Sequence, residues 1–210
     1  MKTLCSPGFE KLLRKFELEE IENSSETIFG IWSDFTLGYF NSGWKEFAKE
    51  NGAPPVISSP DYLGRSVIEV CGQELAPFYK NLFESGLAMS EEELHPVQHR
   101  YECSSADLFR KFLMTVYPLG EGDGLLVTNS LVIEVEHEKR GTDPNPPMFA
   151  EYRDEQDLIR QCSHCRKIKH VSSRSRWDWI PAWVEEPPSE VSHTLCPVCL
   201  EHFYPDDEED

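Results

Sequence analysis

The apolar and polar residues between 25 and 137 alternate in short runs that are separated by turn-forming residues. Alternation with a period of two, rich in β-branched and aromatic residues, predicts half-buried strands. The predicted strands are 27–32, 37–41, 94–103, 109–118 and 124–136. Helical spacing of apolar residues predicts short helices at 43–52 and 73–88. We therefore expect an α+β domain whose five-stranded antiparallel sheet and short helices, all on one face, enclose a pocket.

The first segment, residues 1–24, contains an amphipathic helical pattern over residues 8–24. Its apolar positions at helical spacing are Phe9, Leu12, Leu13 and Phe16. A helix of this kind either packs on the domain that follows it or pairs with another chain. The sequence leaves both interpretations open.

Two Cys-x-x-Cys motifs near the end of the chain give the most specific chemical pattern. The four cysteines are Cys162, Cys165, Cys196 and Cys199, and thirty residues separate the two motifs. Each motif forms a tight turn that directs two sulfur atoms to one point, so together they predict a tetrahedral zinc site. Because four thiolates complete the coordination shell, we expect a structural rather than a catalytic metal.

Histidines are concentrated near these cysteines. His164 and His193 are candidates for a supporting shell around the metal ligands. Whether a histidine replaces one cysteine as a ligand is left open. A reversible thiol pair is the competing interpretation, but such pairs sit at the start of a helix in a βαβ unit, and neither motif has that context.

A small domain, residues 152–205, carries the two motifs. About fifty residues bury little apolar surface alone, so a metal ion would supply much of the stability. Within the spacer, Trp179, Ile180, Trp183 and Val184 fall on one face of a helical turn, and residues 152–162 predict a helical turn or two before the first motif. The sequence around this domain predicts a proline-rich linker at 138–151 and an acidic tail at 206–210.

The net charge of −18 disfavours binding to nucleic acid or to an anionic membrane surface, because both rely on cationic side chains. One basic run, 166–170, with Arg174 and Arg176 beyond it, is a local exception. No stretch has the roughly 18 apolar residues of a membrane span, and the first residues carry no apolar signal region. We expect a soluble cytoplasmic protein in which Cys5, Cys71 and Cys103 are lone thiols.

The chain contains no nucleophile elbow, phosphate-binding loop, zinc-protease helix or kinase signature, so we expect no enzyme activity. His95, His99 and His137 could bind haem in principle, but a lone histidine on a strand or loop is more often a hydrogen-bonded residue. Cys71 lacks the helix-turn setting that flavin photochemistry requires. Neither haem nor flavin is expected.

Several local sequences resemble those of PAS sensory domains, over about residues 25–136. They are Tyr-Phe-Asn41 with the helix around Trp44, the Leu-Gly-Arg65-Ser66 turn, and Arg100-Tyr-Glu-Cys103-Ser-Ser running into the strand from Phe109 to Leu119. The resemblance is to a bacterial subgroup of this family. It implies a pocket for a small ligand or a protein partner, and homodimers formed through residues 8–24.

The C-terminal segment resembles a cysteine module found on bacterial response regulators and PAS-containing signalling proteins. The matching residues are Cys162-Ser-His-Cys165-Arg-Lys-Ile, Trp177 to Trp183, and Ser192 to Pro205 with the second motif inside it. Thr194 stands where this module commonly has glycine. Together the two resemblances imply a non-catalytic sensor or adaptor with a signalling protein partner. A thiol redox switch and a transcription-associated zinc protein remain the alternatives.

Overall fold

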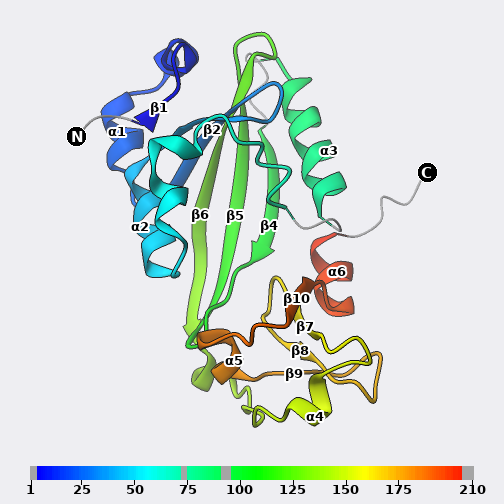
Figure 1. Ribbon diagram of the computed structural model, residues 1–210. Coiled ribbons are helices and arrows are strands. Elements are labelled where there is room, and N and C mark those ends of the chain that lie inside the picture. Colours follow the sequence, from blue (N-terminus) through cyan, green and yellow to red (C-terminus); the bar gives the residue numbers. More distant parts are fainter. Residues whose placement is uncertain (1–3, 72–74, 91–95, 205–210) are drawn as a thin grey trace. The chain divides into compact units, whose positions relative to one another are not determined.

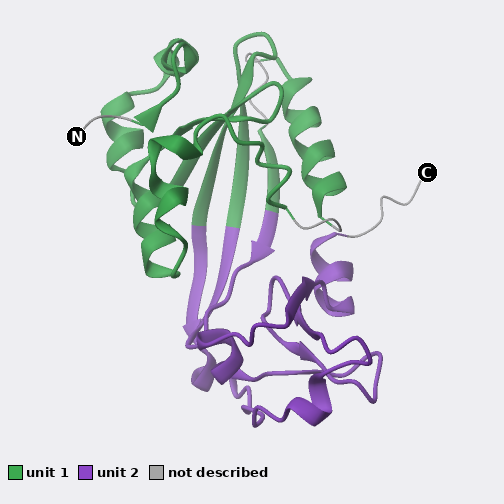
Figure 2. Ribbon diagram, viewed as in Figure 1, with its two compact units in different colours: residues 1–99, 113–130 green, residues 100–112, 131–210 purple. Residues whose placement is uncertain are grey.

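The computed structural model describes residues 4–71, 75–90 and 96–204. The chain forms two compact units, shown in Figure 2: unit 1 comprises residues 1–99 and 113–130, and unit 2 comprises residues 100–112 and 131–210. The division passes through three long strands, so the chain enters and leaves each unit more than once. The domain boundaries expected from the sequence, at residues 24, 137 and 151, stay predictions.

A six-stranded sheet, in the order β1-β3-β2-β6-β5-β4, forms the frame of the fold (Figure 1). The strands are β1 (Leu4–Cys5), β2 (Thr27–Trp32), β3 (Leu37–Phe40), β4 (Val97–Glu102), β5 (Leu108–Leu119) and β6 (Gly124–Glu136). β2 pairs antiparallel with β3 on one side and with β6 on the other. The α+β class is confirmed, and the two-residue strand β1 extends the five expected strands at the β3 edge.

Short helices pack on the strands of unit 1. They are α1 (Leu18–Asn23), α2 (Ser42–Glu50) and α3 (Ala76–Leu87), with 3-10 turns at Phe9–Lys15, Pro55–Ser58 and Pro60–Tyr62. α3 comes close to the sheet at Gly86, where an added Cβ would lie 2.9 Å from Val116 and 3.2 Å from Leu125. The missing side chain at Gly86 therefore sets the distance between helix and sheet.

The segment 8–24 is not one continuous helix. It forms the 3-10 turn Phe9–Lys15 and then α1, because Phe16 adopts an extended conformation between them. The Phe9 ring occupies the space left by two glycines, Gly30 on β2 and Gly38 on β3, where any Cβ would overlap it. Phe9 and Leu13 are fully buried in the core of unit 1, so the interpretation as core packing applies to this turn.

A second sheet, with strand order β10-β7-β8-β9, organises unit 2. Its elements are α4 (Phe149–Tyr152), β7 (Ile159–Cys162), β8 (Ile168–Lys169), β9 (Trp177–Asp178), α5 (Pro181–Glu185), β10 (Val191–Thr194) and α6 (Pro197–Phe203), after a 3-10 turn at His137–Arg140. β10 and β7 run parallel, whereas β7, β8 and β9 are antiparallel neighbours. A core of Tyr152, Ile159, Ile168, Ile180 and Trp183 fills the unit.

Two expectations for this unit were wrong in detail. Residues 152–162 form no helical turns beyond the end of α4; instead the Asp154 carboxylate accepts hydrogen bonds from the backbone N–H groups of Gln156 and Leu158, and this turn leads into β7. The spacer helix begins only at Pro181, so Trp179 and Ile180 precede it, although both are buried.

The segment expected as a linker, 138–151, contacts the rest of unit 2. Its backbone N–H at Asn145 donates a 2.7 Å hydrogen bond to the Trp179 carbonyl. The expected acidic tail, 206–210, lies outside the described residues. Among the helices that the structure describes, none is long and apolar enough to cross a bilayer.

Candidate metal centre

The first cysteine motif begins where β7 ends. The backbone N–H of Arg166 donates to the carbonyl of Cys162 at 3.1 Å, which closes a tight turn around Cys165. Arg166 has a φ of 58°, in the left-handed region that L-residues seldom adopt. The backbone N–H of Cys162 donates to Lys167 at 2.8 Å and ties the returning chain to the strand. Both sulfur atoms of the motif are thereby presented on one side of the turn.

The second motif follows β10 and begins α6. Cys196 is the N-cap residue of this helix, and its sulfur accepts a 3.4 Å hydrogen bond from the backbone N–H of Cys199. Pro197 occupies the first helical turn, where a missing N–H costs least. β10 and β7 are parallel neighbours with Thr194 opposite Cys162, so the two strands deliver the motifs side by side.

The four cysteine sulfur atoms lie within 4.8 Å of one another. Cys165 Sγ and Cys196 Sγ are 3.7 Å apart. Four sulfur atoms bound at about 2.3 Å around a zinc ion would be about 3.8 Å from each other. Cys162, Cys196 and Cys199 are buried and Cys165 is partly buried. The arrangement can hold one metal ion and leaves no coordination position for a substrate.

Hydrogen bonds to sulfur favour the thiolate form that a metal requires. The backbone N–H of Cys196 donates to Cys162 Sγ at 3.4 Å. Hydrogen bonds from the neighbouring thiols, that of Cys165 first, lower the pKa of the Cys162 thiol. Because a buried thiolate is costly without a cation, ionisation of the cysteines and metal binding would occur together.

His164 lies between the first two cysteines, but its ring is engaged elsewhere. Its Nδ1 is 2.5 Å from the carbonyl oxygen of Glu102 and its Nε2 is 2.7 Å from the hydroxyl of Tyr204. Burial lowers the pKa of this imidazole and favours the neutral form. In that form Nδ1–H donates to Glu102, and Tyr204 donates to Nε2. His164 therefore supports the turn rather than a ligand sulfur.

Among the described residues, the other nearby histidines do not belong to the sulfur cluster either. His193 is exposed on β10 and His202 is exposed on α6. His170 accepts a 3.2 Å hydrogen bond at Nδ1 from the backbone of Ser172. The metal-capable cluster that the described residues form consists of cysteines alone. Ligation by all four cysteines stays the prediction.

The remaining candidates from the sequence are scattered. Cys5, Cys71 and Cys103 are partly buried and belong to no cluster with the four cysteines. His99 packs on the ring of Phe78 at 4.7 Å, and His137 packs on Trp179 at 4.2 Å with its Nε2 3.1 Å from the Ser105 carbonyl. His95 lies outside the described residues.

A cavity of about 340 Å³ in unit 2 reaches the cysteine cluster. Three cysteines line it together with charged and aromatic residues that the sequence did not single out as site residues: Glu102, Arg140, Lys167, Trp177 and Trp179. Lys167 lies in the basic run noted in the sequence, and that run was the only available signal. Arg140 and Lys167 place positive charge beside a cluster that becomes negative when its thiols ionise.

The fold and the site define an α+β protein with a four-cysteine cluster able to hold one metal ion. No family model matches the chain, and no curated protein sequence was found to be similar to it.

Solved structures do show similarity. A domain of an HTR-like protein from Haloarcula marismortui ATCC 43049 has 15% identity and a TM-score of 0.36, covering 52% of this chain and 100% of that one. A PAS domain of an HTR-like protein from Haloarcula marismortui has 19% identity and a TM-score of 0.33, covering 59% and 98%. A PAS domain from a two-component sensor histidine kinase has 12% identity and a TM-score of 0.30, covering 59% and 99%.

Proposed function

We propose that this chain is a non-catalytic, cytoplasmic signal-sensing or adaptor protein in which a zinc ion bound by four cysteines stabilises unit 2. The observation that carries the proposal is the convergence of the four sulfur atoms within 4.8 Å. A closed thiolate shell supplies folding energy and no reactive position. Unit 2 would then present a preformed surface that relays the signal or binds a partner protein.

The sensory half of the proposal rests on the resemblance of residues 25–136 to bacterial PAS domains. A small ligand or a protein partner would bind there and shift the population between two arrangements of the domain, which requires no chemical step. The signal would pass to a partner protein.

Elemental analysis and an absorbance scan of the freshly purified full chain test this proposal together. We expect one zinc ion per chain and no absorbance from haem or flavin. Cys162→Ser and Cys199→Ser should reduce the zinc content to well below one ion. Cys103→Ser is the matched control, because this thiol lies outside the cluster and should leave the zinc content unchanged. Wild-type protein purified without metal, yet with unit 2 folded, would refute the zinc assignment.

A thiol redox switch is the second candidate, and the cavity beside the cysteines supports it. Cys165 and Cys196 line this cavity, and their sulfur atoms are 3.7 Å apart. With hydrogen peroxide as oxidant, two thiolates would form one disulfide and release two hydroxide ions, and the metal would leave. Zinc release at micromolar peroxide that dithiothreitol reverses would favour the switch. Retention of zinc under millimolar peroxide would exclude it.

Homodimer formation also remains a proposal. The turn Phe9–Lys15 cannot supply an apolar dimer face through Phe9 and Leu13, because both side chains are buried within their own chain. Sedimentation analysis of the full chain between 1 and 100 µM would decide the oligomeric state. A single monomer mass over this range would remove the dimer from the proposal.

A further inference from the structure

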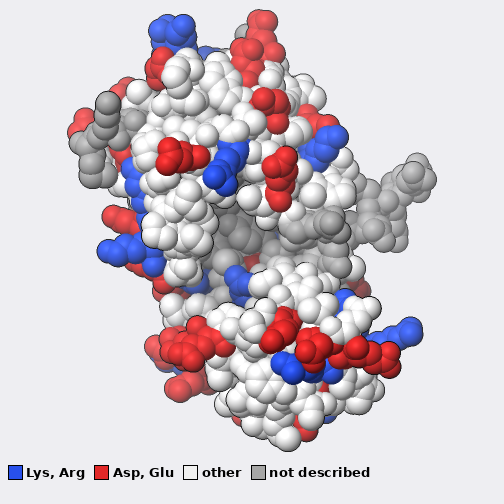
Figure 3. Space-filling model, viewed as in Figure 1, with Lys and Arg blue, Asp and Glu red and all other residues white. Residues whose placement is uncertain are grey.

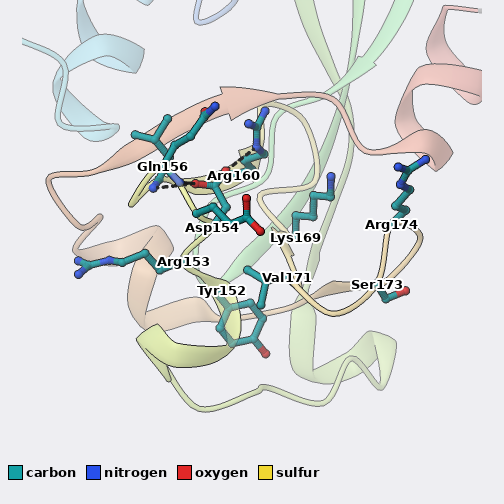
Figure 4. A pocket seen from close by; sticks show the side chains of 11 residues that line it. Tyr152, Arg153, Asp154, Gln156, Arg160, Lys169, Val171, Ser173 and Arg174 are labelled. Carbon is teal, nitrogen blue, oxygen red and sulfur yellow. Dashed lines mark hydrogen bonds and ion pairs between the residues drawn. The ribbon is translucent and has the colours of Figure 1, made fainter.

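A cleft of about 680 Å³ in unit 2 lies apart from the cysteine cluster and is not used by the zinc site (Figure 4). The turn before β7, the strand β8 and the loop after β8 form it. Its lining residues are Tyr152, Arg153, Asp154, Glu155, Gln156, Leu158, Arg160, Lys169, Val171, Ser173 and Arg174. Four of these side chains are cationic, and two, Asp154 and Glu155, are anionic. The ion pairs that each cation forms therefore decide where positive charge remains available.

The acidic charge of Asp154 is already compensated. One carboxylate oxygen accepts from the backbone N–H of Gln156 at 2.9 Å and of Leu158 at 3.1 Å. The other accepts from Arg160 Nε at 3.1 Å, as Figure 4 shows. Arg153 is likewise shared between Asp157 at 3.2 Å and Glu190 at 3.5 Å.

Lys169 and Arg174 differ from these two arginines. Neither forms an ion pair within the part of the chain that the structure describes. Lys169 ends β8 and Arg174 lies in the following loop, and both side chains extend beside the cleft in Figure 4. The backbone N–H of Val171 donates to the Glu151 carbonyl at 2.9 Å, which fixes the start of this loop. Two uncompensated cations are thus held on a short, anchored segment.

Apolar side chains also line the cleft. Tyr152 is buried, and its hydroxyl donates to Asp178 at 2.9 Å, so this hydroxyl already has a partner within unit 2. Val171 is 46% exposed, although it is a large apolar residue. An occupant with both carboxylates and an apolar side chain would satisfy the cations and cover Val171.

We propose that this cleft binds an acidic peptide segment of a protein partner, with its carboxylates on Lys169 and Arg174 and an apolar side chain on Val171. This proposal rests on the adaptor function proposed above and names the chemistry of the partner. The chain carries a net charge of −18, and acidic side chains are spread over the face seen in Figure 3. An extended polyanion such as nucleic acid would be repelled by that surface, whereas a short acidic peptide contacts only the cleft, where Lys169 and Arg174 form no ion pair with a described residue.

Fluorescence anisotropy of the full chain with a fluorescein-labelled peptide of alternating glutamate and leucine residues tests the proposal. We expect saturable binding at 50 mM NaCl that weakens at 300 mM NaCl, because the ion pairs are exposed to solvent. Lys169→Glu and Arg174→Glu should each weaken binding roughly 3- to 10-fold. Lys49→Glu makes the same charge change at an exposed position of α2 in unit 1 and should leave binding unchanged.

Two further measurements make the result decisive. The zinc content and thermal unfolding of each variant show whether it folds. If Lys169→Glu does not fold, Lys169→Gln removes the same positive charge with a milder change and replaces it in the binding experiment. Equal binding by the wild type, K169E and R174E would overturn the proposal, as would no binding at 1 mM protein. Stronger competition by a single-stranded oligonucleotide or by inorganic phosphate than by unlabelled peptide would also overturn it. If the wild-type chain contains zinc but does not bind the peptide, the peptide proposal fails while the zinc assignment stands.

Discussion

Asn41 is one buried amide that joins three elements of unit 1, α1, β2 and α2. Its Oδ1 accepts from the backbone N–H groups of Ile28 at 3.0 Å and Trp44 at 2.9 Å. Its Nδ2 donates to the carbonyls of Ile21 and Glu26, both at 2.9 Å. The side chain is fully buried and caps α2 at the same time. No other side chain of similar size offers two acceptor sites and two donors in this arrangement.

We predict that Asn41→Ala lowers the free energy of unfolding by about 2–4 kcal/mol, because several buried backbone groups lose their partners. Urea unfolding followed by tryptophan fluorescence measures the change. Asn51→Ala is the control: this exposed residue lies at the end of α2, and its replacement should cost about 0.5 kcal/mol or less. A similar loss for both variants would contradict the role assigned to Asn41.

The lone thiols Cys5 and Cys71 should react slowly with alkylating agents. Burial is the main cause that raises the pKa of each to about 11, and Glu10 contributes at Cys5. Since the thiolate is the nucleophile, their rate of alkylation by iodoacetamide should still rise about tenfold between pH 9 and pH 10. An unperturbed peptide thiol, with a pKa of about 8.5, is already about three-quarters ionised at pH 9, so its rate should rise by less than about 1.5-fold. Mass spectrometry of each cysteine-containing peptide after timed quenching measures the alkylation rates. Equal rates at pH 9 and pH 10 for Cys5 and Cys71 would contradict the prediction.

At the scale of elements, the sequence predicted the strands of the large sheet because apolar alternation and turn residues coincide there. β2 and β6 have the expected bounds. It failed between 152 and 162, where charged residues separate the apolar ones in a way that also fits a helix. The turn found in the structure depends on the two backbone hydrogen bonds that the Asp154 side chain accepts. The spacing of apolar residues does not reveal hydrogen bonds of this kind.

The metal centre shows the same contrast. The four cysteines could be identified by spacing, because two short turns suffice to bring each pair together. The role of His164 could not, since its partners Glu102 and Tyr204 are far from it in the sequence. The contacts join the end of β4, the first cysteine motif and α6 through one ring.

We predict that Tyr204→Phe destabilises unit 2 by about 1–3 kcal/mol, because buried His164 then lacks a hydrogen-bond donor at Nε2. The zinc content should stay at one ion per chain, since His164 is not among the clustered ligands. Thermal unfolding and elemental analysis measure the two effects. Tyr62→Phe, at a partly exposed position of unit 1, is the matched control. Loss of zinc in Tyr204→Phe would assign the histidine to the metal shell instead.

At the scale of the whole molecule, each unit contains a hydrophobic cluster of its own. The cluster around Phe9, Leu13 and Tyr39 belongs to unit 1, and the cluster around Tyr152, Ile159 and Trp183 belongs to unit 2. Only the second unit contains the four cysteines. Removal of the metal should therefore act on one core and spare the other.

We predict that a strong chelator removes the hydrogen-exchange protection of the β7 and β10 amides and leaves that of β2 and β3 largely unchanged. The reason is that, without a metal ion to join them, the four buried cysteines no longer link the two motifs, and the small core of unit 2 loses that stabilisation. Mass spectrometry of exchanged peptides before and after chelation checks this, and re-addition of zinc should restore the protection. Uniform loss of protection over both units would show that the metal stabilises the chain as one cooperative structure.

The parallel pairing of β7 and β10 determines when the four cysteines can meet. Parallel neighbours cannot be joined by a tight turn, so the chain must cross from Cys162 through β8, β9 and α5 before Thr194 reaches its place opposite Cys162. Closing such a long loop is slower than forming a hairpin. Cys162 and Cys165 are therefore synthesised before Cys196 and Cys199, and the four-cysteine cluster can form only after Cys199 has emerged.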